Sequence, residues 1–175
     1  MIWRNDRFGS VATRLGKAMH QVATSLRQWP RTSAALGFGA AGTALSLLWW
    51  SPVIFEARGV VPYALFIGTP GLSAAISGWA LGKPLFNSAR TCRPRGAALR
   101  GVAIASLALL LFAPLFATLY VLTQPVTEHW DILSLTFLIL VGSAVVIWWL
   151  VALIGATVGW VLYRLASYGA GRKSA

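Results

Sequence analysis

The stretch 132–163 contains thirty-two residues and not one charged side chain. An apolar run of about eighteen or more residues predicts a transmembrane helix. At about 1.5 Å per residue a straight helix of this length would measure about 48 Å, whereas the hydrocarbon core of a bilayer is about 30 Å thick. Tilt alone would have to exceed about 50°, which is outside the usual range, so we expect this helix to kink or to extend beyond the bilayer.

The composition fits an integral membrane protein and excludes several kinds of site. Of the 175 residues, 57% are hydrophobic and 11% are charged, whereas soluble domains carry about 25% charged residues. The single cysteine, Cys92, excludes an internal disulfide and a multi-thiolate zinc site within this chain. His20 and His129 lie far apart in the sequence, so no haem, metal or other cofactor is expected.

Three shorter apolar stretches precede the long one, which predicts an all-α fold with four transmembrane helices. The expected spans are 33–50, 60–82, 101–123 and 132–163. The domain organisation follows from them: a basic amphipathic segment 1–31, a transmembrane domain 32–165 and a basic tail 166–175.

The second span contains a helix-breaking sequence, with Gly68, Pro70 and Gly71 around Thr69. Pro70 cannot donate a hydrogen bond to the carbonyl of Phe66, and Thr69 followed by proline is typical of a new helix start. One interpretation is a pair of half-helices, which build substrate sites in transporters. The other is a proline kink accommodated by packing. We favour the kink, because no ionisable residue lies beside it.

Small residues spaced four apart predict where helices pack closely. Such residues let helix backbones approach in lipid, where packing drives association. The expected packing positions are Gly39 and Thr43, Ala74 and Gly78, and Gly155 and Gly159. The last pair forms a GxxxG pattern, which serves either internal packing or homodimerisation, and we favour internal packing.

The first 31 residues predict a helix that lies on the membrane surface. Apolar side chains recur at steps of three and four along one face: Val11, Leu15, Met19, Val22, Leu26 and Trp29. A basic amphipathic helix of this kind lies in the membrane plane, here ending at Pro30. The same composition also describes an organellar transit peptide, but we favour a retained interfacial helix.

The distribution of charge predicts the topology. With four spans, the two tails and the 83–100 loop share one side and hold fourteen of the fifteen Lys and Arg residues. Cytoplasmic segments are enriched in Lys and Arg, so we expect an inner-membrane protein with both termini in the cytoplasm. The net charge of +11 then needs no nucleic-acid partner. The expected contacts with anionic lipid headgroups are Arg14, Lys17, Arg90, Arg93, Arg95, Arg100 and Arg164.

The tryptophans of the long helix give two hypotheses for its surplus length. In the one we favour, Trp148 and Trp149 form the cytoplasmic aromatic belt, so 150–163 overhangs on that side and the 11–29 helix covers it. In the alternative, Trp160 and Arg164 mark the cytoplasmic boundary and the surplus lies on the opposite side.

The spans lack the groups that catalysis and ion coupling require. None of them has an ionisable residue at its centre, and no catalytic motif occurs. Glu128, His129 and Asp131 share a short connector, where polar side chains are typically just solvated. Cys92 is expected to be a free cytoplasmic thiol. We therefore predict a protein that is not an enzyme.

The layout of four spans with both ends in the cytoplasm is similar to that of immunity proteins against pore-forming bacteriocins, and of several small accessory membrane proteins. No sequence motif carries this resemblance, so no residue roles follow from it. We expect an accessory, assembly or anchoring subunit that binds another integral membrane protein. The alternatives are a small-molecule or lipid transporter or channel built on the break near Pro70, an immunity-type protein, and a homo-oligomer.

Overall fold

The computed structural model describes residues 6–56, 64–87, 94–123 and 132–168, and these are almost entirely helical with no strand among them. The elements are α1 (Asp6–Gln28), α2 (Pro30–Glu56), the π-helical turn η1 (Ala64–Gly68), α4 (Thr69–Leu81), α5 (Lys83–Asn87), α6 (Pro94–Thr123), α7 (Ile132–Val146) and α8 (Trp148–Tyr168). Four segments are long and apolar enough to cross a membrane: Pro30–Trp49, Ala64–Leu81, Pro94–Thr123 and Trp148–Ser167. The predicted all-helical class with four apolar spans is confirmed at this level.

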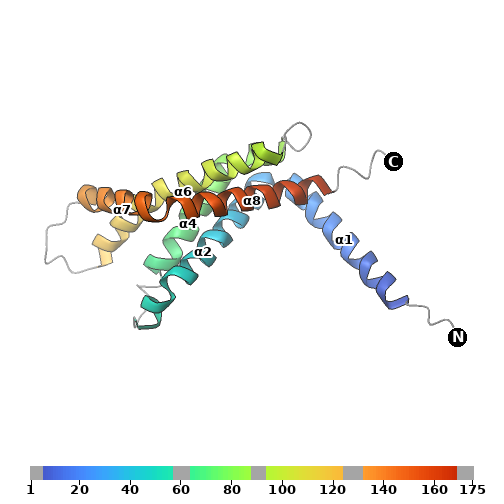
Figure 1. Ribbon diagram of the computed structural model, residues 1–175, viewed down its shortest axis with the longest axis horizontal. Coiled ribbons are helices and arrows are strands. Elements are labelled where there is room, and N and C mark those ends of the chain that lie inside the picture. The colour runs from blue at the N-terminus through green and yellow to red at the C-terminus, as the bar shows by residue number, and fades with distance from the viewer. Residues whose placement is uncertain (1–5, 57–63, 88–93, 124–131, 169–175) are drawn as a thin grey trace.

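The helices form two closely packed pairs. Helix α2 packs along α4, and α6 packs along α8, while α4 also contacts α6. The pairs meet at the end of the bundle from which α1 projects, and they diverge toward the opposite end (Figure 1). Helix α7 continues in the direction of α8 and contacts mainly α6.

Small side chains dominate the buried core. The buried hydrophobic cluster includes Ala34, Ala97, Ala108 and Ala166, together with larger groups such as Phe38. Alanine and glycine let helix backbones come close, so dispersion contacts accumulate over long stretches of the paired helices. The bundle is therefore held by close backbone approach.

Glycines make that approach possible in both pairs. A Cβ atom built on Gly78 of α4 would lie 2.7 Å from the carbonyl oxygen of Ala34 in α2. A Cβ built on Gly159 of α8 would lie 2.6 Å from the carbonyl oxygen of Ala97 in α6. Both separations are too short for a real side chain, so only glycine fits while the helices remain this close.

The long apolar stretch is not one helix. Ile147 separates α7 from α8, and its carbonyl oxygen accepts hydrogen bonds from the amides of both Leu150 and Val151, each at 3.0 Å. Three consecutive β-branched residues, 145–147, precede this point and lower the helix propensity there. The expectation of a single helix over 132–163 is corrected: a candidate span, α8, follows a shorter apolar helix, α7.

Residues 150–163 pack against the bundle on one face. Gly155 and Gly159 pack against α6, and Leu162 approaches Gly37 of α2. The favoured overhang of 150–163 and the alternative, with Trp160 and Arg164 at the cytoplasmic boundary, both stay predictions. Helix α7 lies outside the candidate span Trp148–Ser167.

Helix α1 touches the bundle only through its last turns. Ala23 is 1% exposed and Leu26 packs against the core, but Met19 and Val22 are 38% and 46% exposed. The rest of α1 points away from the other helices (Figure 1). The expected cover of 150–163 by the apolar face of this helix is therefore limited to its end, and the more N-terminal side chains Val11 and Leu15 lie outside the described side chains.

Several helix ends differ from the expected ones. The reason is that helices begin at some prolines and continue through others, although proline was expected to interrupt them. Helix α2 begins at Pro30, three residues before the expected start of the span, and continues past Pro52 to Glu56. Helix α6 begins at Pro94, where a proline at the first helical position loses no hydrogen bond. Pro114 lies inside α6 without interrupting it.

Candidate functional site

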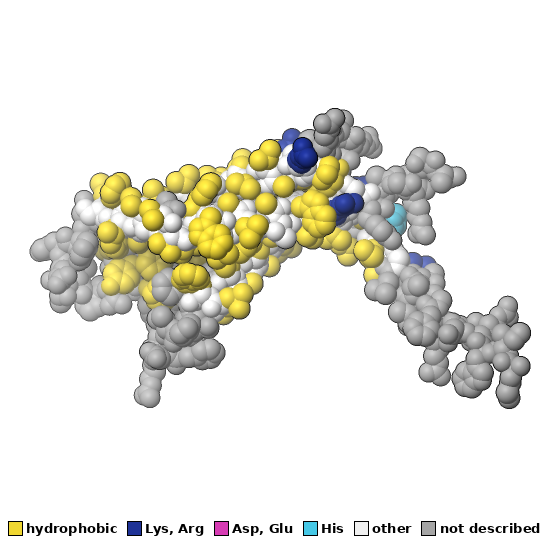
Figure 2. All heavy atoms as spheres, in the orientation of Figure 1, with side chains coloured by type: hydrophobic (Ala, Val, Ile, Leu, Met, Phe, Trp, Pro, Cys, Tyr) yellow, Lys and Arg dark blue, Asp and Glu magenta, His cyan; other side chains and the backbone are white. Residues whose placement is uncertain are grey.

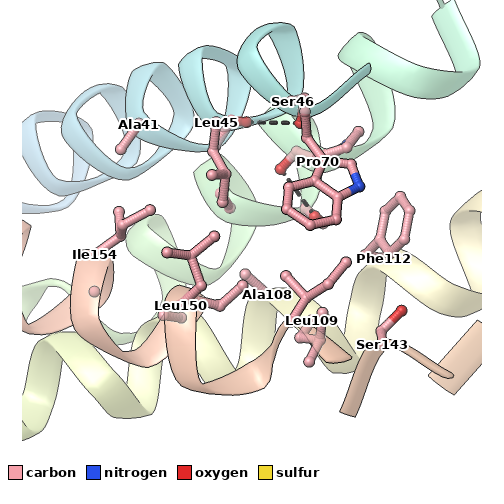
Figure 3. Close-up of a pocket in the computed structure, with 18 of the residues that line it drawn as sticks. Ala41, Leu45, Ser46, Pro70, Ala108, Leu109, Phe112, Ser143, Leu150 and Ile154 are labelled. Atoms are coloured by element: carbon pink, nitrogen blue, oxygen red, sulfur yellow. Dashed lines mark hydrogen bonds between the residues drawn. The ribbon is translucent and has the colours of Figure 1, made fainter. Parts of the chain in front are cut away.

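The divergence of the two helix pairs leaves an apolar cavity of about 510 Å³ between α2, α4, α6 and the junction of α7 with α8. Its side chains converge from all of these elements, with Leu45 and Ser46 on one side and Leu109, Leu150 and Ile154 on the other (Figure 3). The volume lies within the range of about 300–1,000 Å³ that is usual for small-molecule sites.

Small residues form part of the cavity wall and bulky residues form the rest. The small ones include Ala41, Gly42, Ala74, Ala105 and Ala108. The bulky ones include Phe38, Trp49, Phe112, Phe116 and Ile139. Phe112 and Phe116 are in contact through tilted rings 5.4 Å apart, and Phe116 also stacks on Tyr120 at 6.1 Å.

Two of the three serines that line the cavity donate their hydroxyls within their own helices. Ser46 donates to the carbonyl oxygen of Gly42 at 2.8 Å, and Ser73 donates to the carbonyl oxygen of Pro70 at 3.0 Å. Among the described residues, no buried side-chain nitrogen or oxygen lacks a hydrogen-bond partner. The cavity therefore offers an apolar surface with few free polar groups.

Among the residues whose side chains are described, no ionisable one lines this cavity. Acid–base and nucleophilic chemistry need such a group within reach of the reacting atoms. Over the described part of the chain, no group of three or more His, Cys, Asp or Glu residues is placed to hold a metal ion. The arrangement can enclose an apolar group, and it offers no group that would react with it.

The residues of the predicted helix break line the cavity in part. The backbone stays helical throughout: Gly68 is in the right-handed helical region at φ −68° and ψ −45°, and η1 runs directly into α4. The expectation that Thr69 caps a new helix was wrong, because its hydroxyl donates backward to the carbonyl oxygen of Leu65. Pro70 lines the cavity, whereas Gly71 is buried against Thr43.

The predicted packing residues lie in the two helix pairs. Gly39 and Thr43 of α2 face α4, where Ala74 and Gly78 lie. Gly155 and Gly159 of α8 face α6, and a Cβ on Gly155 would lie 2.6 Å from the carbonyl oxygen of Gly101. All of these contacts are internal to the chain.

The described basic side chains gather at the end of the bundle where the helix pairs meet (Figure 2). Arg31 lies over the ring of Trp79 with 5.0 Å to its centroid, and Arg164 lies over the ring of Trp160 at 5.2 Å. Arg100 donates to the carbonyl oxygen of Pro84 at 2.6 Å. These contacts fix the cations close to the helix ends.

The other predicted headgroup residues are placed less fully. Lys17 on α1 and Arg95 at the start of α6 are exposed. The side chain of Arg14, and residues Arg90 and Arg93, lie outside what the structure describes. The same holds for Cys92 and for the connector with Glu128, His129 and Asp131.

In comparisons with known proteins, no family model, curated protein or solved structure matches this chain. The cavity therefore has to be interpreted from its own residues. Sequence reasoning did not anticipate it, because Phe38, Leu109 and Ile154 read as ordinary members of apolar spans. The only sequence signal nearby was Pro70, which forms part of its wall.

Proposed function

We propose that this chain is a non-enzymatic accessory subunit that binds another integral membrane protein through α7. The observation that carries the proposal is the exposure of this helix. Leu133, Phe137 and Val145 are 75%, 69% and 76% exposed, and no residue whose side chain is described in α7 is buried. Helix α7 has no charged side chain and lacks the polar face of a helix that lies at the membrane surface.

The length of the helices supports the same proposal. Helix α6 has 30 residues and so measures about 45 Å, and the row formed by α7 and α8 measures about 55 Å. Both exceed a hydrocarbon core of about 30 Å by more than ordinary tilt absorbs. A partner that packs against α7 would shield the surplus apolar surface from water.

The proposal also covers the membrane in which the chain lies and the orientation of the chain in that membrane. Arg31, Lys83, Arg95 and Arg164 all belong to the same end of the bundle, and this asymmetry supports a cytoplasmic location for both termini in a cell inner membrane. Basic side chains at that face are suited to anionic lipid headgroups, and the exposed Lys17 extends the basic surface along α1.

Three alternatives rank below this proposal. An immunity-type role would use the same exposed helix, with a foreign membrane protein as the partner. A transporter or channel would use the region of Pro70, but the helical continuity from η1 to α4 leaves no open helix end there to bind a substrate. A homo-oligomer would pair α7 with a second copy.

Photo-crosslinking in native membranes tests the proposal. A photoreactive residue in place of Phe137 or Leu133 should give a protein adduct of defined mass, because both side chains point away from the bundle. Leu99, which is 70% exposed on α6, is the matched control and should give no such adduct. Adducts of twice the mass of the chain would indicate a homo-oligomer, and the absence of any protein adduct from α7 would contradict the proposal.

A further inference from the structure

We propose that the cavity between the two helix pairs is a binding site for one acyl chain of a membrane phospholipid, supplied by the leaflet opposite the basic end of the bundle. An apolar space of about 510 Å³ does not remain empty within a bilayer. Apolar cavities exclude water, and unfilled space forfeits dispersion contacts along the whole lining. The occupant must therefore be apolar, and the dimensions of the cavity decide which apolar group it is.

The length of the cavity along α2 and along α6 matches one leaflet. On α2 the lining extends from Phe38 to Trp49, and on α6 from Ala105 to Phe116. Each is eleven helical steps, or about 16 Å. One leaflet of a hydrocarbon core about 30 Å thick is about 15 Å deep, which is the depth that a single chain occupies.

A hydrocarbon chain is the occupant that the convergence of side chains from α2, α4, α6 and the α7–α8 junction favours over a partner helix. A single hydrocarbon chain is much thinner than a helix and has no backbone polar groups to satisfy. The site is also separate from the exposed face of α7 proposed above, since Leu133, Phe137 and Val145 are not part of its lining.

The chemistry of the lining fits a chain without polar groups. Of the three serines in the lining, Ser46 and Ser73 already donate their hydroxyls to backbone carbonyls, and no charged side chain of a described residue faces the space. A ligand with a charged group inside the cavity would therefore lose its hydration without gaining a charged partner among these residues.

The position of Trp49 indicates the leaflet. Trp49 follows Arg31 by eighteen helical steps, or about 27 Å, so it lies near the far boundary of a hydrocarbon core about 30 Å thick. It is 50% exposed, and tryptophan side chains favour membrane interfaces, where the indole N–H reaches polar groups. A phospholipid with its headgroup near Trp49 would extend its chain along Leu45 toward Phe38.

Substitutions that fill the cavity test this site. Gly142 lines it, and a Cβ built there meets nothing within 4 Å, so Gly142→Phe can enter the space without moving a helix. Ala41→Phe fills it from α2, independently of α7. Leu153→Phe is the matched control, because Leu153 is 60% exposed on α8 and does not line the cavity.

Native mass spectrometry after stepwise delipidation gives the readout. The unsubstituted chain should retain one phospholipid, Leu153→Phe should retain it equally, and both filling variants should lower its occupancy at least tenfold. No retained phospholipid in the unsubstituted chain would overturn the proposal, as would retention that is unchanged in both filling variants.

A phospholipid with a diazirine at the middle of its acyl chain provides a measurement that needs no variant. Its adducts in the unsubstituted chain should concentrate on Leu109 and Leu150, which line the cavity (Figure 3). Leu110 is 54% exposed on the outer surface of α6 and is the reference for ordinary annular lipid. Equal labelling of Leu109 and Leu110 would mean annular contact only and would overturn the proposal.

Discussion

The guanidinium of Arg27 donates from Nε to the carbonyl oxygen of Ala166 at 3.0 Å, and its Nη2 donates to the same oxygen. Ala166 belongs to the last turn of α8, where carbonyl groups have no partner within the helix. A positively charged donor is favourable at this end of a helix dipole. The contact therefore caps the C-terminal end of α8 and attaches the last turn of α1 to the bundle.

Removing this donor should loosen α1 without unfolding the spans. Arg27→Met keeps the apolar stem of the side chain and loses both hydrogen bonds, at a cost of about 1 kcal/mol for a partly exposed contact. Amide hydrogen exchange in residues 16–28 should accelerate about fivefold, while exchange in α6 stays unchanged. Gln28→Met is the control, since Gln28 is exposed. Equal exchange in the two variants would show that Arg27 does not hold α1 in place.

Adding a single methyl group at the contact of α6 with α8 should destabilise the protein. A Cβ on Gly155 would lie 2.5 Å from the Cβ of Ala105 and 2.6 Å from the carbonyl oxygen of Gly101. Gly155→Ala should therefore lower the free energy of unfolding by about 1–3 kcal/mol, as overpacking does. Gly142→Ala should leave it unchanged or raise it by up to about 1 kcal/mol, because its surroundings are open. Titration with SDS, followed by circular dichroism, measures both values.

The contact of α2 with α4 predicts an order of sensitivity between two glycines. A Cβ on Gly78 meets the backbone oxygen of Ala34 at 2.7 Å, whereas a Cβ on Gly39 meets the methyl group of Ala75 at 3.1 Å. A backbone atom cannot move without moving its helix, but a gap of 3.1 Å needs only a small adjustment. Gly78→Ala should therefore destabilise the bundle more than Gly39→Ala in the same SDS titration. The reverse order would show that the pair is less closely packed at Gly78.

Some parts of this fold could be predicted from the sequence and others could not. The four apolar spans could be predicted, because the length of an apolar run and the absence of charge are local properties. Small residues four apart at Gly39 and Thr43, and at Gly155 and Gly159, pointed to the faces that lie between paired helices. Which face meets which helix depends on the tertiary arrangement, and no single span contains that information.

The interruption at Ile147 shows where local reasoning failed. No proline or glycine marks it, and Trp148 and Trp149 read as an interfacial belt, so the hypothesis placed the membrane boundary there. In the structure Gly155 and Gly159, which follow these tryptophans, pack against α6. The cavity could not be predicted from the sequence either, because it arises from the angle between the helix pairs and not from any motif.

The two prolines within the spans should respond differently to substitution. Pro70 directly follows the π-helical turn η1 and lies in the first turn of α4, where the missing backbone N–H of proline costs little. Pro70→Ala should therefore change the free energy of unfolding by less than about 1 kcal/mol. Pro114 lies inside the regular helix α6, where proline costs up to about 3 kcal/mol. Pro114→Ala should therefore stabilise the protein more than Pro70→Ala does. A larger gain at Pro70 would mean that η1 is itself strained by the proline.

The orientation proposed for the chain depends on the basic end of the bundle facing the cytoplasm, and Cys92 offers a direct measurement. It is the only cysteine in the sequence and lies between Lys83 and Arg95, which both belong to that end. A membrane-impermeant maleimide added to sealed, intact cells should leave Cys92 unmodified, and permeabilising the cells should allow modification. The control replaces Cys92 with serine and places a cysteine at Thr127, within the connector on the opposite side; this variant should react without permeabilisation. Modification of Cys92 from outside intact cells would contradict the cytoplasmic assignment of both termini and would place the proposed phospholipid in the cytoplasmic leaflet.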